Sequence, residues 1–219
     1  MLTLRHSLFA VALLGVSLPA GAANWSLGAE AGTTGFGGSL SYRFNDNLAL
    51  TGSYGGFSYD GIDHETDDAD YEGDADVDVY GLTLDYFPFA GRFFVSLGAV
   101  RPDIAVQVVG RPKAGGSYEF NGRTYTAAEV GTLEGKASLG DSVQPYLGIG
   151  WRGSHAAGLG MFGRLGAFLT DAEVDLHATG AASDPRLAGD VQREEDDLQD
   201  DLDDYGFYPV AVVGLEYTF

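Results

Sequence analysis

The chain has 219 residues, a formal net charge of −20 and a pI near 4.2, and it contains no cysteine. No basic stripe is available to neutralise phosphates, which argues against a nucleic-acid-binding role. Without cysteine, neither a disulfide framework nor a thiolate metal site can form.

The first residues, 1–23, have the features of a cleaved signal peptide. A basic residue, Arg5, precedes the apolar run Leu8–Val16, and a small-x-small cleavage site follows at Ala20-Gly-Ala22. A short amino-terminal core helix is the alternative. No cysteine follows the site, so a lipid anchor is not expected. We expect an exported mature chain that begins near residue 24.

The remaining segment, 24–219, contains eight stretches in which apolar and polar residues alternate with the period of a β-strand. At about ten residues, such a stretch can cross a bilayer obliquely with its apolar face toward lipid. The mean hydropathy of −0.03 is compatible with this, because the alternating apolar and polar residues of a barrel strand average to a value near zero. The stretches are Trp25–Gly32, Gly35–Phe44, Leu48–Tyr59, Val77–Phe89, Arg92–Val100, Ser142–Arg152, Gly158–Thr170 and Tyr208–Phe219.

The expected connections from Asn45 onward alternate between short and long. Outer-membrane barrels have short periplasmic turns and long extracellular loops. We therefore predict an all-β fold: an eight-stranded antiparallel up-and-down transmembrane β-barrel with periplasmic termini and long acidic extracellular loops. One bent strand over 25–44 and a periplasmic β-sandwich are the alternatives. The short turns are 45–47, 90–91 and 153–157, and the long connections are 60–76, 101–141 and 171–206.

The third long connection is expected to contain one short helix. In the segment Asp190–Asp204, the apolar residues Val191, Leu198 and Leu202 are spaced by seven and four, which gives one narrow stripe on a helix. The other residues are mostly acidic. The helix could cover the barrel mouth, enter it or stand in solvent.

Four strand patterns resemble those of a known family. They are Gly81–Phe89, Arg92–Ala99, Gln144–Gly150 and Gly214–Phe219. The chain resembles the small outer-membrane β-barrels of the ornithine-uptake porin (CarO-type) family over most of its mature length. The resemblance implies an eight-stranded barrel, linked in some members to uptake of basic amino acids and to entry of certain antibiotics. It supplies no binding motif that transfers to residues of this chain.

Charged residues occur on the predicted inward faces of the strands. An eight-stranded barrel is barely wide enough for its own side chains, so these charges could pair and fill the interior. They could instead form a constriction that passes small zwitterions or cations. Small residues on the same faces leave room for it: Gly28, Ser39, Ser41, Ser53, Gly98, Gly148, Gly150 and Gly214. The candidate lumen and selectivity residues are Glu30, Arg43, Asp85, Arg152, Arg164 and Glu216.

The first long connection is strongly acidic and contains neither Lys nor Arg. Mutual repulsion favours a solvated loop, whereas the functional interpretation is a mouth that attracts cations. The triplet Asp74-x-Asp76-x-Asp78 lacks the Gly and the distal Glu of a calcium loop, so neither a metal nor another cofactor is expected. The candidate cation-attracting residues are Asp60, Asp63, Glu65, Asp67, Asp68, Asp70, Glu72, Asp74, Asp76 and Asp78.

These patterns together predict a porin of the outer membrane for passive uptake of small cationic or zwitterionic solutes. The alternative is a plugged structural or surface-interaction barrel without transport. Catalysis is not expected, because no spacing specifies a nucleophile, a base and an orienting acid. Expected partners are outer-membrane lipid, lipopolysaccharide, small solutes, and the barrel-assembly machinery through the terminal strand that ends at Phe219.

Overall fold

The computed structural model describes residues 24–65, 69–113, 115–140, 142–153, 157–170, 172–203 and 206–219. The predicted signal peptide, 1–23, lies outside these residues. The elements are β1 (Trp25–Gly32), β2 (Gly35–Asn45), β3 (Leu48–Glu65), β4 (Ala69–Tyr86), β5 (Phe93–Pro112), β6 (Ser117–Phe120), β7 (Arg123–Thr126), α1 (Ala127–Val130), β8 (Leu133–Leu139), β9 (Gln144–Arg152), β10 (Gly158–Leu169), β11 (Ala172–Ala178), η2 (Thr179–Ala182), α2 (Pro185–Asp203) and β12 (Phe207–Thr218).

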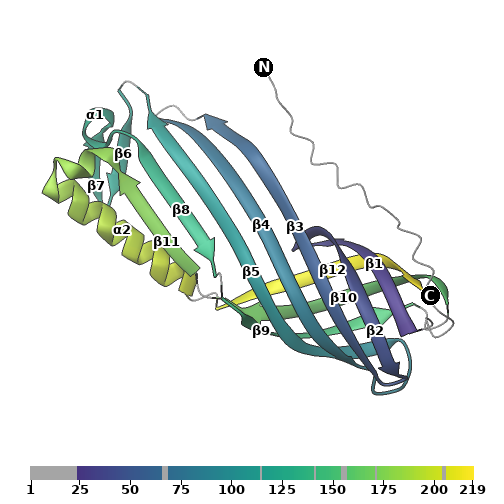
Figure 1. Ribbon diagram of the computed structural model, residues 1–219. Helices are drawn as coiled ribbons and strands as arrows, with labels where there is room; N and C mark the ends of the chain where they lie inside the picture. The colour runs from purple at the N-terminus through teal and green to yellow at the C-terminus, as the bar shows by residue number, and fades with distance from the viewer. Residues whose placement is uncertain are drawn as a thin grey trace.

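In the described chain, eight strands close into an antiparallel barrel in the order β1-β2-β3-β4-β5-β9-β10-β12 (Figure 1). The first and last strands pair from Ser26↔Thr218 to Gly32↔Val212, which closes the ring. The predicted up-and-down barrel is confirmed. A turn at Thr33-Thr34 separates β1 from β2, so the alternative of one bent strand over 25–44 is wrong. The β-sandwich is also wrong, because the sheet closes on itself.

The outward-facing side chains of the barrel form an exposed apolar band that includes Leu82, Leu97 and Leu215. Aromatic rings border the band at both ends, as in other transmembrane barrels. Trp25 packs on Tyr42 at the end where the chain terminates, and Tyr54 packs on Tyr80 at the opposite end. We call these ends proximal and distal. Among the described residues, no helix is long and apolar enough to span a membrane.

Three strands continue far beyond the barrel on its distal side. β3 and β4 have 18 residues each and β5 has 20, about twice the 9–11 residues that a tilted transmembrane strand needs. β5 pairs with β9 up to Val100↔Gln144 and then with β8 from Ile104↔Leu139 onward. β8 in turn pairs with β11. We call this continuation of β3, β4 and β5, together with β8 and β11, the distal blade (Figure 1).

The expected long loops are therefore corrected. The described part of the acidic connection 60–76 is strand and not loop, because β3 and β4 pair from Asp60↔Asp74 to Glu65↔Asp70 with one irregularity at Gly61. Much of the connection 101–141 is β5 and β8. Asp74 and Asp76 alternate with Ala75 and Val77, so this segment keeps the two-residue period of a β-strand although it is strongly acidic. Repulsion is reduced because β5 supplies cations, as in the 2.6 Å Arg111–Glu72 ion pair.

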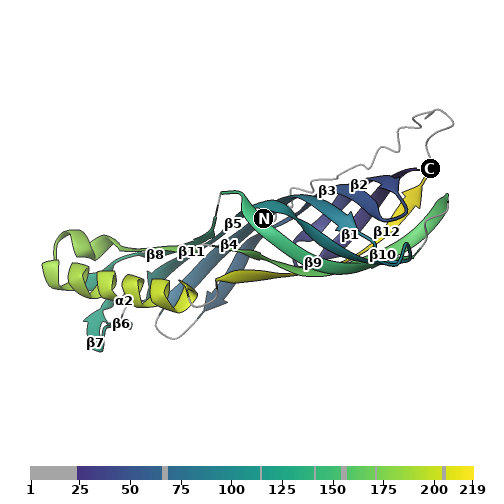
Figure 2. The ribbon, with the colours of Figure 1, turned by 90° about the horizontal axis from the view of Figure 1, so that it is seen from below.

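The predicted helix is confirmed as α2, although it begins at Pro185, five residues earlier than expected. It neither enters the barrel nor stands free in solvent but packs along β11, the last strand of the blade (Figure 2). Its side chains bind the open edge of that strand. Glu195 accepts a hydrogen bond from the Leu176 backbone N–H at 2.8 Å, and Gln199 accepts one from Val174 at 3.0 Å. An edge covered in this way cannot pair with another strand.

The tip of the blade has a small hydrophobic core of its own, separate from the barrel interior. The hairpin β6–β7 and α1 fold against α2 and the sheet there. The buried residues of this distal core are Ala69, Tyr118, Phe120, Tyr125, Val130, Ala178, Leu187 and Val191. The apolar stripe of α2 thus includes Leu187 and Val191, whereas Leu198 stays 41% exposed.

This difference predicts the outcome of two truncations on the same helix. Leu187→Ala removes a side chain that is 0% exposed and should cost about 2–5 kcal/mol in the distal core. Leu198→Ala should leave the stability of the distal core almost unchanged, because this side chain is already 41% exposed. Limited proteolysis should therefore cut α2 faster in the first variant, while both barrels keep heat-modifiable gel migration. Equal cleavage of both variants would contradict this packing.

Candidate functional site: the barrel lumen

The proximal half of the lumen contains a carboxylate held by hydroxyl groups. Asp85 is fully buried and accepts hydrogen bonds from Thr51 and Ser96 at 2.6 Å each and from Thr83 at 3.1 Å. Three donors satisfy most of the acceptor sites of an ionised carboxylate. This side chain is therefore held in place by the strands that surround it.

An ion pair crosses the lumen beside this cage. The guanidinium of Arg152 lies 3.3 Å from a carboxylate oxygen of Glu216, and both side chains are buried. Arg152 also donates to the hydroxyl of Ser41 at 3.0 Å, and Ser41 is 2.9 Å from Thr51, which binds Asp85. One polar chain thus runs from Glu216 through Arg152 to Asp85.

A second ion pair lies nearer the middle of the barrel. Arg164 of β10 donates to Glu30 of β1 at 2.5 Å, and both side chains are almost inaccessible to solvent. Removing one partner would leave an uncompensated charge at low dielectric, which is strongly destabilising.

The sixth candidate, Arg43, lies at the proximal rim and is only half-buried. Its guanidinium stacks 4.1 Å from the centre of the Phe87 ring and donates to the carbonyl of Asp46 at 2.7 Å. The structure therefore brings four of the six candidates together as two ion pairs. It places Asp85 on the same polar chain as one of those pairs and Arg43 at the entrance.

The distal half of the lumen is apolar, which the sequence did not indicate. Phe168 stacks on Tyr208 with ring centroids 5.1 Å apart. We call the residues around this pair the distal apolar layer. They are Val77, Val79, Val100, Ile104, Tyr146, Phe162, Phe168, Val210 and Val212, with Leu139 and Tyr208 packed against them.

Three of the glycines that were expected to leave room for a channel, Gly28, Gly150 and Gly214, make room for aromatic rings instead. A Cβ on Gly214 would lie 2.5 Å from Phe162, and one on Gly28 would lie 3.1 Å from the same ring. A Cβ on Gly150 would collide with Phe94. A cavity between Glu30, Arg164 and Val212 has a volume of about 30 Å³, enough for about one water molecule. The lumen is therefore filled in this structure.

The acidic candidates that the structure describes lie on the blade and not in the lumen. Strand alternation places Asp70, Glu72, Asp74, Asp76 and Asp78 on the face of β4 that continues the outward face of the barrel. Asp60, Asp63 and Glu65 belong to β3, whereas Asp67 and Asp68 lie outside the described residues. Among the described residues, no group of three or more His, Asp or Glu side chains could hold a metal ion.

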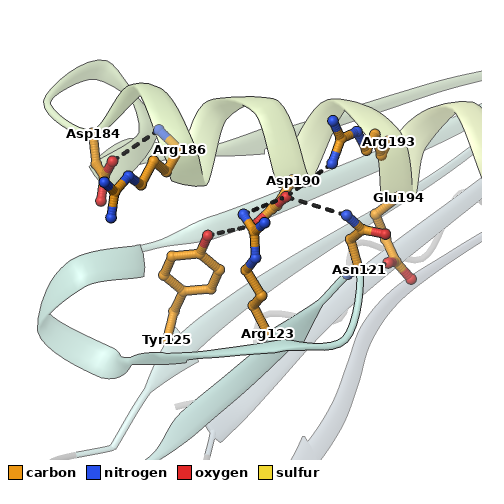
Figure 3. A network of polar contacts seen from close by, with 8 residues as sticks. All are labelled: Asn121, Arg123, Tyr125, Asp184, Arg186, Asp190, Arg193 and Glu194. Atoms are coloured by element: carbon orange, nitrogen blue, oxygen red, sulfur yellow. Dashed lines mark hydrogen bonds and ion pairs between the residues drawn. The ribbon is translucent and has the colours of Figure 1, made fainter.

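A polar network joins α2 to the β6–β7 hairpin at the tip of the blade (Figure 3). The buried carboxylate of Asp190 accepts hydrogen bonds from the Tyr125 hydroxyl at 2.5 Å, from Arg123 at 2.9 Å and from Asn121 at 3.2 Å. Tyr125 first, and also Asn121 and Arg123, hold the pKa of Asp190 below its usual value. No pattern in the sequence indicated this role, because Asp190 is one acid among many in its segment.

A closed barrel of eight strands with an exposed apolar band, aromatic borders and a charged interior defines a small outer-membrane β-barrel of the porin type. No protein-family model matches the sequence, and curated protein sequences give no match. Solved structures do match. The crystal structure of CarO from Acinetobacter baumannii has a TM-score of 0.60 and 25% identity, covering 89% of this chain and 97% of that chain.

A second crystal structure, of CarO2 from Acinetobacter baumannii, has a TM-score of 0.58 and 20% identity, covering 89% of this chain and 98% of that chain. The chain thus has the CarO-type fold over nearly its whole described length. The family resemblance that the strand patterns indicated is supported by these structures.

The Glu30–Arg164 pair gives a prediction for the stability of the barrel. Glu30→Gln or Arg164→Met alone should lower the free energy of unfolding by about 3–5 kcal/mol, because each leaves a buried partner charge unpaired. In the double variant, the loss of unfolding free energy should be smaller than the sum of the two single losses. Urea unfolding in lipid vesicles measures all three. Additive losses would show that the two side chains do not interact.

The network of Asp190 gives a prediction for acid sensitivity. Its pKa is lower in the folded protein than in the unfolded chain, where Asp titrates near ~3.9. The stabilisation is therefore complete above ~3.9 and is lost as the pH falls through the folded pKa. Protease protection of α2 should fall on acidification. Asp190→Asn should weaken protection at pH 7 and flatten this dependence, whereas the exposed control Asp197→Asn should preserve both.

Proposed function

We propose that this protein is a narrow outer-membrane barrel for passive uptake of small zwitterionic or cationic solutes. The observation that carries the proposal is the presence of two ion pairs in one lumen, Glu30–Arg164 and Arg152–Glu216. A solute with an ammonium and a carboxylate group exchanges with the partners of such a pair without leaving a charge unpaired at low dielectric. A neutral solute of the same size has no such compensation.

Passage requires movement of the distal apolar layer. The stacked rings of Phe168 and Tyr208 and the side chain of Val210 occupy the distal half of the lumen. A solute must displace these side chains before it reaches Glu30 and Arg164. The layer therefore serves as a gate, and the flux is low compared with that of a porin with an open lumen.

The acidic blade supplies the long-range attraction in this proposal. The chain carries 32 acidic and 12 basic residues, and Asp74, Asp76 and Asp78 line one face of β4. Their field raises the local concentration of cations. It acts over a Debye length of ~10 Å at 0.1 M salt, so the preference for cations weakens as salt is added.

The small cavity in the lumen, about 30 Å³, favours a second candidate function. In this alternative the barrel stays closed and only anchors the distal blade in the membrane. The two functions differ in whether solutes cross the membrane at all.

Flux into liposomes separates the two functions. With purified, folded protein, radiolabelled arginine and glycine should enter faster than glutamate or sucrose, and added salt should reduce the advantage of arginine. The double variant Glu30→Gln/Arg164→Met should lower arginine and glycine flux several-fold, since it removes the exchanging charges. Flux equal to that of empty liposomes for every solute would refute uptake and leave the anchoring function.

A further inference from the structure

A hollow interrupts the exposed apolar band on the outer surface of the barrel. It lies where β5, β9, β10, β12 and β1 run side by side, and its volume is about 540 Å³. Pockets that bind small molecules have volumes of about 300–1,000 Å³. We call it the outer hollow. Its walls are large, exposed apolar side chains: Phe93, Ile149, Trp151, Leu165 and Val213.

The floor of the outer hollow is formed by small residues of neighbouring strands. Gly163 of β10 lies between Trp151 of β9 and Val213 of β12, and Val213 pairs in turn with Ala31 of β1. A Cβ on Gly163 would meet the Val212 carbonyl oxygen at 3.7 Å, which is ordinary van der Waals contact. The three lumen glycines described above differ, because aromatic rings of the chain lie against them. Packing within the chain therefore leaves the space above Gly163 open.

A guanidinium group lies at the proximal end of the outer hollow. Arg92 directly precedes Phe93, its side chain is exposed, and its guanidinium carbon lies 5.8 Å from the centre of the Trp151 ring. The described residues on the outward faces of β9, β10 and β12 carry no charge. Tryptophan and arginine side chains are typical of the boundary between bilayer and water. The outer hollow thus combines an apolar body with a cationic end at this boundary.

The proximal position of Arg92 indicates which membrane leaflet the outer hollow meets. The short turns between β2 and β3 and between β4 and β5 lie at the proximal end, and short turns of outer-membrane barrels face the periplasm. The periplasmic leaflet of an outer membrane consists of phospholipids. A phospholipid in this leaflet places its acyl chains beside the apolar walls and its anionic phosphate group at the level of Arg92. Its charge and its shape are therefore complementary to the outer hollow.

We propose that the outer hollow binds one acyl chain of an anionic phospholipid whose phosphate group contacts Arg92. Lipid tails are as apolar as the barrel surface, so the hydrophobic effect does not hold the chain there. The bound chain gains dispersion contacts with the walls and the floor, and Arg92 donates a charge-assisted hydrogen bond to the phosphate. A zwitterionic phospholipid carries its own ammonium group, which offsets this attraction. The inference requires insertion into the membrane and does not require solute uptake.

The two tryptophans of the chain provide the test. Trp25→Phe leaves Trp151 in the wall of the outer hollow, whereas Trp151→Phe leaves Trp25, which is also proximal but does not line the hollow. Each single-tryptophan protein is reconstituted at low salt in phosphatidylcholine vesicles. Part of the lipid is replaced by phosphatidylglycerol with brominated acyl chains, or by phosphatidylcholine with the same brominated chains. Bromine quenches tryptophan fluorescence on contact, so the quenching curves give the relative affinity of each tryptophan's surroundings for the two lipids.

At Trp151, phosphatidylglycerol should be preferred about fivefold, the gain expected for one basic residue at an anionic membrane surface. At Trp25, neither lipid should be preferred. In the protein that retains Trp151, Arg92→Gln should abolish the preference. Gly163→Leu should also abolish it, because the new side chain fills the outer hollow. The control Arg101→Gln, at the distal end of the barrel part of β5, should leave the preference unchanged.

The site is disproved if the preference at Trp151 is absent, or equals that at Trp25, in protein that still shows heat-modifiable migration. A preference that Arg92→Gln abolishes and Gly163→Leu preserves is attraction of the lipid headgroup alone, and it also overturns the site. Weak quenching of Trp151 by both lipids, with strong quenching of Trp25, shows that a second copy of the chain covers the outer hollow instead. These measurements are independent of the flux experiment, so either proposal can fail without the other.

Discussion

The structure depends on the requirement that every backbone N–H and C=O group in a bilayer be hydrogen-bonded within the protein. The chain meets it by joining its first and last strands, and the Phe219 N–H donates to the Trp25 carbonyl at 3.0 Å where the ends meet. Closure with eight strands fixes a narrow diameter. Successive side chains of each strand then face lipid and lumen in turn, and the lumen is too narrow to hold much water. The outer surface is therefore apolar, and the inner side chains must satisfy one another.

The narrow lumen explains why its charges occur with partners. Arg152 and Arg164 each meet a glutamate, and Asp85 is held by three hydroxyl groups. Replacement of buried ion pairs by apolar side chains of similar volume is often neutral or stabilising, so the stability of the barrel does not by itself require these charges. The distal apolar layer separates these charges from the distal side of the barrel. Uptake requires that this layer open, whereas anchoring does not.

The strand β5 connects the barrel to the blade. It is shared between two sheets, first with β9 and then with β8. Because β5 changes its partner from β9 to β8, the sheet continues beyond the barrel, while the barrel itself closes through the pairing of β5 with β9. The blade has edges, and α2 covers the β11 edge with the side chains of Glu195 and Gln199. The core around Leu187 and the carboxylate of Asp190 hold α2 and the β6–β7 hairpin together.

The sequence alone determined the eight barrel strands, their lipid-facing side and the inward direction of the six charged candidates, because alternation is a local property that survives in any register. It also placed α2, from the spacing of its apolar residues. Only the tertiary structure decided that β3, β4 and β5 continue as a blade, that Phe162 and Phe94 fill the space beside the glycines, and that Arg164 meets Glu30. These features join residues up to 134 positions apart, and such partners are chosen by strand register and closure, which no local pattern encodes.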